Sequence, residues 1–318
     1  MKNSTSIITE NLNPHRSKLI NAIQSINLED YSTPPDGVWG CKAIIQCGNV
    51  SVKSTDLDLE FDIPFDDNLE ADEGEIIIYN LSDKSISELT VGSTISIKAG
   101  YNNDLGTIFI GTIQKVSTKR EGADRATTIK VSDDIIKKTV NKSYDEGATA
   151  QQILEDLLRE AAGQDGYKFE PVHNYEYENS VTLDGELETE IKKYADVCGV
   201  SVFKVLNTIY AININSEGTN ISGEVFELNE DTGLIGSPEP FEETVAAEDY
   251  EDTYNGIDAE MFLKHNVVVT MQVKVKSEQY NGTYAIKSGS HSFDGTAGTT
   301  KIKAVQKFNS VKIEKDEG

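Results

Sequence analysis

Basic residues are scarce in this sequence, and the shortage excludes several functions. Its 318 residues contain 29 Lys and Arg against 54 Asp and Glu, so the formal net charge is −25 and the pI is near 4.5. Proteins that hold DNA or RNA neutralise the phosphates with Lys and Arg, and anionic membrane surfaces attract the same side chains. We therefore expect no stable nucleic-acid binding and no binding to an anionic membrane surface.

Long hydrophobic runs are also missing. No run of 18 apolar residues occurs, and the first 20 residues lack the apolar stretch of a secretory signal. We therefore expect no direct membrane insertion. Hydrophobic residues still make up 37% of the chain, which is enough for ordinary cores, and the length indicates about two domains.

Cysteine is too rare for a disulfide framework. The three cysteines are Cys41, Cys47 and Cys198. Cys41 and Cys47 lie six residues apart and could stand on one strand pair. We expect buried free thiols in a protein made in a reducing compartment.

Motifs of enzymes and of cofactor or metal sites are absent. The sequence has no glycine-rich dinucleotide fingerprint, phosphate-binding loop, zinc-protease helix motif or nucleophile elbow. The four histidines stand apart from other ligand types: His15, His173, His265 and His291. A zinc site needs three or four converging ligands. We expect a protein that is not an enzyme, with no catalytic residue, no cofactor and no metal site.

Three segments offer alternatives that we weigh against this expectation. Ser290 and His291 are neighbours on a predicted strand and would point to opposite faces, so we expect hydrogen bonding at a turn edge rather than catalysis. Residues 66–75 are rich in oxygen ligands but lack the glycine order of a calcium loop, which favours a solvated loop over adventitious calcium. Paired carboxylates of a glycoside hydrolase are a further alternative. The single tryptophan, Trp39, argues against it, because polysaccharide grooves usually stack sugars on several aromatic side chains.

The first 38 residues are predicted to form an arm. Asn13 and Pro14 are typical of a helix start, and the apolar residues that follow recur at helical spacing. Residues 32–37 contain two prolines that end this helix. The helix could pack on its own domain or on a neighbouring subunit.

Residues 39–140 have the texture of a small antiparallel β-barrel. Runs rich in Ile, Val and Thr alternate with turn glycines, and a short helix is predicted from Ser82 to Leu89. The predicted strands are Cys41–Gln46, Ile76–Tyr79, Thr94–Ala99, Thr107–Val116 and Thr127–Val131.

Residues 141–232 form a predicted α/β segment with two amphipathic helices. The first helix begins at Thr149 as N-cap and ends at Gly163; the second carries an apolar face from Leu187 to Cys198 and ends at Gly199. Val200–Val205 and Thr208–Ile214 are predicted to form a hairpin.

Residues 233–318 are predicted to contain an acidic loop and a second small β-barrel. The tract 238–252 has little sign of regular structure and is predicted to be a solvated loop. Strands are expected at Val267–Val275, Gly282–Ser288 and Thr299–Val305. No sequence repeat is visible, although the two β regions could be structural duplicates whose sequences have diverged.

Acidic residues gather in two stretches without Lys or Arg. Ten Asp and Glu lie between Ser54 and Glu75, and fourteen lie between Lys204 and Lys264. The stretches flank the predicted strands. Their carboxylates could face an internal channel or the solvent.

Two groups of motifs resemble those of phage baseplate hub proteins. The first group is Phe61-x-x-x-Phe65-Asp66-Asp67, Glu75-Ile-Ile-Ile-Tyr-Asn-Leu-Ser82, Val91-Gly92, Ile95-x-Ile97-x-Ala99-Gly100-Tyr101 and Gly106-Thr-Ile-Phe-Ile-Gly-Thr-Ile113. The second group is Thr232-Gly-Leu-Ile-Gly-Ser-Pro238, Asn281-Gly-Thr-Tyr284 and His291-Ser292-x-Asp294-Gly295. Together they span about residues 40–310. The chain resembles the tail hub family of Gram-positive contractile phages, defective prophages and R-type tailocins.

The resemblance implies a β-rich α+β fold in which two small antiparallel barrels flank a helical α/β segment. It also implies a homotrimer whose six barrels make a pseudo-sixfold ring between a hexameric tail tube and a trimeric central spike. The expected partners are the tail tube or tube-initiator protein, the spike and other baseplate (wedge) proteins, which the helices after Thr149 and Gly185 would dock. The expected location is the baseplate of a virion or tail-like particle, assembled in the bacterial host cytoplasm.

The acidity and the function leave alternatives open. Carboxylates lining the lumen would repel DNA that passes through it, or the negative charge could simply keep an assembly subunit soluble. Besides a hub, the sequence allows the N-terminal hub domain of a siphophage tail-associated protein, a hub-like part of another injection machine, or a tail-tip cell-wall hydrolase. A small-molecule or carbohydrate-binding module is a further class, and would be a monomer.

Overall fold

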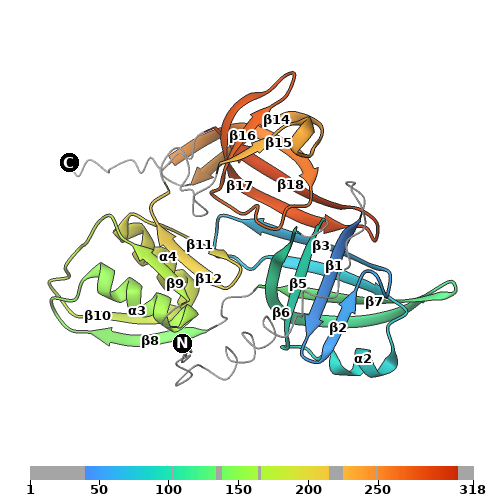
Figure 1. Ribbon diagram of the computed structural model, residues 1–318. Helices are drawn as coiled ribbons and strands as arrows, with labels where there is room; N and C mark the ends of the chain where they lie inside the picture. Colours follow the sequence, from blue (N-terminus) through green and yellow to red (C-terminus); the bar gives the residue numbers. More distant parts are fainter. Residues whose placement is uncertain are drawn as a thin grey trace, which may run out of the picture.

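The computed structural model describes residues 40–306 except 102–103, 134–137, 164–165, 215–224 and 248–249. The predicted arm at residues 1–38, with its helix, lies outside the described residues, as do Trp39 and His15. Figure 1 shows three parts, an α/β part beside two sets of β-strands. No helix in the described ranges is long and apolar enough to cross a membrane.

The first β set contains every strand predicted for its region. It comprises β1 (Cys41–Cys47), β2 (Val50–Lys53), β3 (Leu59–Asp66), β4 (Glu73–Tyr79), β5 (Thr94–Tyr101), β6 (Asp104–Glu121) and β7 (Asp124–Ser132). The predicted short helix is α2 (Asp83–Glu88), and its N-cap Ser82 accepts a hydrogen bond of 3.1 Å from the Ser85 backbone N–H. Alternate strand residues are buried, as the period-2 pattern requires.

The α/β part confirms both predicted helices. Its elements are β8 (Thr139–Tyr144), α3 (Ala150–Ala162), β9 (Tyr167–Glu170), β10 (Val181–Glu186), α4 (Leu187–Cys198), β11 (Ser201–Val205) and β12 (Thr208–Ile212). Thr149 forms a capping box with Gln152, and Gly199 ends α4 in the left-handed conformation that lets glycine close a helix. The predicted hairpin is the antiparallel pair of β11 and β12.

The second β set corrects two predictions. It comprises β13 (Phe226–Leu228), the 3₁₀ turn η2 (Glu230–Thr232), β14 (Leu234–Ala247), β15 (Tyr250–Phe262), β16 (Gln272–Lys276), β17 (Asn281–Phe293) and β18 (Gly298–Val305). The tract 238–252 is therefore not a loop, because β14 and β15 pair through it as a long hairpin. Its prolines misled the prediction: β14 is an edge strand, where a missing N–H is tolerated. Residues 267–271, predicted as strand, precede β16 and lie outside any strand.

The main strands of both sets join in one open antiparallel sheet. Its order is β14-β15-β18-β17-β3-β4-β7-β6-β5-β1-β2, and β16 and β13 branch from β17. The joint between the sets is β17, which pairs with β16 through its first residues and with β3 through Ser288–Phe293. The mostly β architecture is confirmed. The two small barrels are not seen as closed units, since among the described strands no pairing closes either set on itself.

The two sets have the same strand order. In the first set the order is β3-β4-β7-β6-β5-β1, and in the second it is β14-β15-β18-β17-β16-β13. In both, the elements also follow one another along the chain in the same sequence, and only the last pair differs, because β13 runs parallel to β16 whereas β1 is antiparallel to β5. This order is what structural duplicates predict.

The agreement extends to single residues. β6 and β17 each carry one extra residue where they pair with β7 and β18, Gln114 in β6 and Lys287 in β17. Aligning these bulges makes Ile113 equivalent to Ile286, and Thr118 equivalent to His291. The alignment places a buried isoleucine before both bulges, as in a shared core plan.

Each part of the molecule has its own apolar core. The first core lies within the first β set, the second lies beneath α3 and α4, and the third lies within the second β set. A fourth, smaller cluster joins Phe203 and Ile212 of the β11–β12 hairpin to Ala285 of β17 and Val305 of β18. The predicted division at residues 39–140, 141–232 and 233–318 stays a prediction.

Candidate functional site

The cysteines and the candidate metal ligands can be placed within the described residues. No group of three or more His, Cys, Asp or Glu in these ranges is placed to hold a metal ion. Cys41, Cys47 and Cys198 are free and buried, as predicted. Burial raises the pKa of Cys41 to about 12 and that of Cys198 to about 11, so both remain unreactive thiols.

His291 lies on β17, two residues before the strand ends at Phe293, and it is 2% exposed. Its Nδ1 is 2.9 Å from Thr300 Oγ1, and its ring lies 4.9 Å from the Phe65 ring between centroids. Burial lowers its pKa to about 4, so the ring is neutral. Ser290 pairs with Pro64 and Lys301 on the other face, so the structure does not bring Ser290 and His291 together.

The other described histidines fill contacts between segments. His265 Nε2 is 2.9 Å from Asp104 Oδ1, which links the loop after β15 to the start of β6. Its ring occupies the space that a Cβ at Gly106 would need. The His173 ring similarly lies against Gly199, at 2.6 Å from where its Cβ would be. Both histidines therefore make packing contacts between segments of the chain.

The acidic segment 66–75 is less solvated than predicted. Asp66 ends β3, and it accepts hydrogen bonds from the Asn68 backbone N–H at 3.1 Å and side-chain amide at 2.7 Å. The backbone N–H of Asp72 donates to Asp133 Oδ1 at 2.8 Å. Burial, followed by the charges of Asp66 and Asp133, raises the pKa of Asp72 to about 7.

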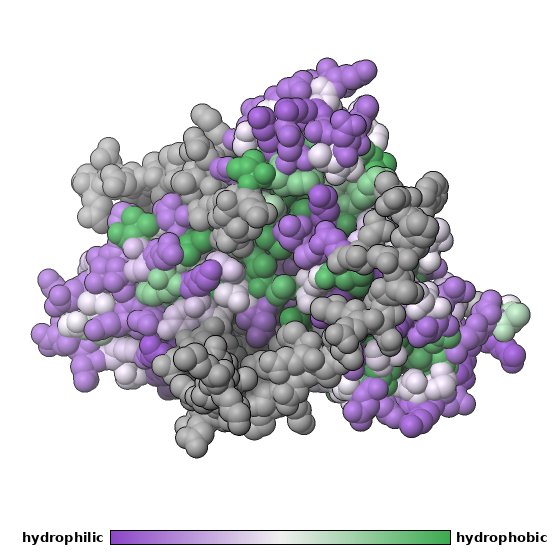
Figure 2. Space-filling view, in the orientation of Figure 1, coloured by the Kyte–Doolittle hydropathy of each residue, from purple (hydrophilic) through white to green (hydrophobic). Residues whose placement is uncertain are grey.

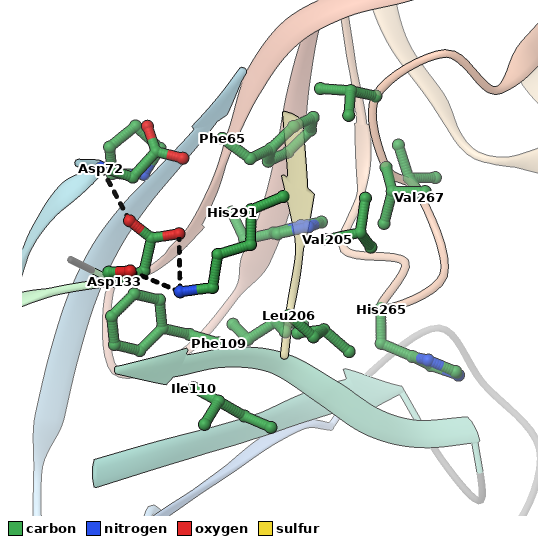
Figure 3. A pocket seen from close by; sticks show the side chains of 15 residues that line it. Phe65, Asp72, Phe109, Ile110, Asp133, Val205, Leu206, His265, Val267 and His291 are labelled. Carbon is green, nitrogen blue, oxygen red and sulfur yellow. Dashed lines mark hydrogen bonds and ion pairs between the residues drawn. The ribbon is translucent and has the colours of Figure 1, made fainter. Parts of the chain in front are cut away.

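Lys204 brings these carboxylates to the junction of the three parts. Its Nζ lies 3.4 Å from Asp133 Oδ2 and also donates to the Asp133 backbone carbonyl (Figure 3). The pair is largely buried, with side chains 12% and 16% exposed. The ion pair therefore fastens β11 to the ends of β7 and the β3–β4 loop.

The cavity at this junction is too small for a substrate. Its volume is about 50 Å³, and its lining includes Phe65, Phe109, Leu206, Val267 and His291. Figure 3 shows these side chains pointing into it from both β sets and from the β11–β12 hairpin. Ligand pockets usually measure several hundred Å³, so this one fits at most a few water molecules. It is a packing junction.

One face of the shared sheet is polar from β14 to β6, and we identify it as the candidate functional surface. Residues that pair across neighbouring strands point to the same side. One row crosses the second set and another crosses the first: Glu239, Asp258, Lys303 and Ser288, then Asp62, Glu75, Lys130 and Lys115. Two open grooves of about 660 and 370 Å³ lie over these rows.

The charges on this polar face repeat from one set to the other. By the bulge alignment, Asp258 opposite Lys303 is equivalent to Glu75 opposite Lys130, and Glu239 is equivalent to Asp62. The order is acidic, acidic, then basic in both sets. Figure 2 shows hydrophilic residues over the outer parts of the visible side and hydrophobic ones gathering toward its centre.

Sequence reasoning missed this polar face because no motif marks it. Its residues alternate with core residues on eight strands that are scattered through 240 positions of the chain, so only the pairing order reveals them. The alternation itself, as in Glu73–Tyr79, was the available signal.

No protein-family model matches this sequence, and no curated protein matches it. Solved structures do match. A tail protein from Neisseria meningitidis MC58 aligns with a TM-score of 0.59 at 10% identity, over 84% of this chain and 96% of that one. The 43 kDa tail protein of prophage MuSo2 from Shewanella oneidensis aligns with a TM-score of 0.58 at 9% identity, over 83% and 98%.

A third match comes from a secretion system. It is an Escherichia coli component of the type VI secretion system that exhibits structural similarity to the T4 bacteriophage tail proteins gp27 and gp5. Its TM-score is 0.56 at 11% identity, over 84% of this chain and 77% of that one. The chain therefore has the fold of phage tail hub-like proteins, the fold that its sequence motifs resemble.

Proposed function

We propose that the protein is a structural hub of a phage tail or tail-like particle, and not an enzyme. Three copies would form a ring that joins a hexameric tail tube to a trimeric spike. The observation that carries the proposal is the duplicated strand order within one sheet. Three copies of a chain with two equivalent β sets supply six equivalent units, which matches sixfold symmetry on one side and threefold symmetry on the other.

The division of the chain follows from this role. Residues 39–140 and 233–318 would be the two ring units, each closing into a barrel-like wall only in the ring, and residues 141–232 would be the outer segment. The segment's helices α3 and α4 would dock wedge proteins of the baseplate. The tube or tube-initiator protein and the spike would contact the two ends of the ring. The particle would assemble in the bacterial cytoplasm.

The polar face would line the channel of such a ring. Its lysines stand directly opposite its carboxylates, as in Asp258 and Lys303, so the wall would be close to charge balance. This pattern favours the explanation that the net charge of −25 keeps the free subunit soluble, over a channel that repels DNA through carboxylates alone.

The test is the mass of the purified full chain and of the chain recovered from particles. A trimer of about three times 34.9 kDa supports the ring, measured by sedimentation and native mass spectrometry. A chain that stays monomeric at every concentration and also in particles overturns the proposal and favours a binding module. Electron microscopy of trimers would then show whether six units surround one channel.

The tail-tip hydrolase and the siphophage hub domain differ in their readouts. Release of soluble fragments from peptidoglycan by the purified protein would overturn the non-enzymatic role. A ring that binds a non-contractile tail tube but no wedge protein would favour the siphophage protein.

A further inference from the structure

The joint between the two β sets occurs once inside the chain. The two edges that would form a second joint, along β14 and along the second half of β6, have no partner strand among the described residues. Inside the chain, Ser288–Phe293 of β17 pair with Phe61–Asp66 of β3. The equivalent of β17 is β6, and the equivalent of β3 is β14. Among the described residues, Lys115–Glu121 of β6 pair only with β7, and β14 pairs only with β15.

We propose that β6 of one copy pairs antiparallel with β14 of a second copy, in the register of the internal joint. The proposal rests on the ring described above and specifies its subunit interface. Lys115 is equivalent to Ser288 and Lys119 to Ser292, from the bulge alignment. Asp62 is equivalent to Glu239, because they lie opposite the equivalent residues Glu75 and Asp258. The internal register therefore places Lys119 opposite Glu239.

The charges at this interface are complementary. In the internal joint the equivalent contact is a hydrogen bond of 2.8 Å from Ser292 Oγ to Asp62 Oδ1. Across the subunits a lysine replaces the serine and a glutamate replaces the aspartate. Lys115, Lys119 and Arg120 on β6 are exposed, and so are Glu239 and Glu242 on β14. A basic edge thus faces an acidic one.

The backbone ladder at this interface would be incomplete. Pro238 and Pro240 have no N–H, so β14 brings carbonyl acceptors but fewer donors than β3 does. Such a proline-bearing edge also protects the free subunit from unspecific strand addition. Cohesion then depends more on the charge pairs, and the assembly should weaken as salt screens them.

The strand order points to a second molecule as the partner. β14 and β6 are separated by seven strand spacings along the sheet, about 34 Å of path at roughly 4.8 Å each, and they do not pair within the chain. A disulfide needs Cα atoms less than about 7 Å apart. We therefore expect a disulfide between positions 119 and 239 to join two chains.

The experiment uses the full chain with cysteines at the proposed contact. Lys119→Cys/Glu239→Cys should form disulfide-linked dimers and trimers under mild oxidation. Lys115→Cys/Glu239→Cys, which is four residues out of register, should form at least tenfold fewer. The native cysteines are buried and provide the background control. A trimeric protein in which both pairs cross-link equally, or neither does, overturns this interface and leaves the hub role standing.

Charge reversal supplies the second readout. Lys119→Glu and Glu239→Lys should each lower the trimer fraction at least fivefold at low salt, and the double variant should restore it. Lys84→Glu and Glu88→Lys on the exposed α2 are matched controls that should change nothing. Trimers unaffected by either reversal contradict the interface. Efficient 119–239 links in open chains instead of closed trimers would confirm the pairing and overturn the ring.

Discussion

The two β sets carry different residues at equivalent positions of their long strands, β17 and β6. β17 carries Gly289 and His291 where the equivalent ladder positions of β6 carry Val116 and Thr118. In the second set, β3 lies beside β17, and Phe65 packs against the His291 ring. In the first set this part of β6 pairs with β7 on one side, no described strand lies on its other side, and Thr118 is exposed. The residue types at these positions therefore depend on whether a strand such as β3 lies alongside, and not on the pairing of β17 with β18 or of β6 with β7.

A side-chain contact between the two strands is present in both sets, although the residues differ. His291 Nδ1 lies 2.9 Å from Thr300 Oγ1, and at the equivalent place Thr118 Oγ1 lies 3.2 Å from Thr127 Oγ1. A polar pair therefore joins β17 to β18 in the second set, and a polar pair at the equivalent place joins β6 to β7 in the first. Only the pair in the second set can change its charge.

The largest change in stability should come from exchanging the residues at Gly289 of β17 and the equivalent Val116 of β6. A Cβ at Gly289 would lie 2.6 Å from the Phe65 ring and would also meet the Lys301 carbonyl oxygen. Gly289→Val should cost at least about 3 kcal/mol of unfolding free energy through overpacking. Val116→Gly should cost about 1 kcal/mol. Urea unfolding of both variants measures the difference, and equal costs would contradict the role of the neighbouring strand.

His291 should make the second set sensitive to acid. Its folded pKa of about 4 is below the ordinary value of 6.5, so the unfolded chain binds the proton more tightly. Stability is then complete above about pH 6.5 and falls as the pH drops toward 4, by about 3 kcal/mol. His291→Gln removes the titrating group while keeping a side chain that can bond to Thr300.

The measurement is the unfolding free energy between pH 8 and pH 4. The Gln variant should lose less stability over this range than the parent protein. Thr118→Ser, in the first set, is the control and should leave the pH dependence unchanged. A Gln variant with the parent's full acid sensitivity would assign that sensitivity to other groups.

A smaller effect should arise from the β3–β4 connection, which is a loop in the first set where β14 and β15 form a hairpin in the second. The pKa of Asp72 in this loop is raised to about 7 by burial and by nearby carboxylates. The folded protein binds this proton more tightly than the unfolded chain does. The contribution of Asp72 to the unfolding free energy therefore falls as the pH rises from about 4 through 7. Asp72→Asn should stabilise the protein by about 1 kcal/mol at pH 8 and have little effect at pH 4.

Asp133→Asn is the matched comparison for that prediction. Asp133 holds Lys204, so its replacement should destabilise the protein at pH 8 where Asp72→Asn stabilises it. Thermal unfolding at the two pH values measures both. Variants that shift stability in the same direction would contradict the assignment of opposite roles.

Local patterns in the sequence predicted most elements. Thr149, Gly163 and Gly199 mark helix ends that the structure confirms, because capping depends on residues close in the chain. The β14–β15 hairpin was missed, since its strands are acidic and contain prolines that an edge strand tolerates. The polar face was missed for another reason: its rows join residues such as Asp62 and Ser292, which are 230 positions apart.

The single bulge residues have a consequence for insertions and deletions. In β17 the bulge lies where the strand leaves β16 and begins to pair with β3, and in β6 it lies where the pairing with β5 ends. Ile113 and Lys115 pair with the consecutive residues Val131 and Lys130, so loss of Gln114 would leave a regular ladder in which Lys115 and Lys119 keep their face. Loss of a residue elsewhere in the strand would instead move every following side chain to the other face. The bulge is thus the one place on this ladder where a deletion preserves which side chains meet water.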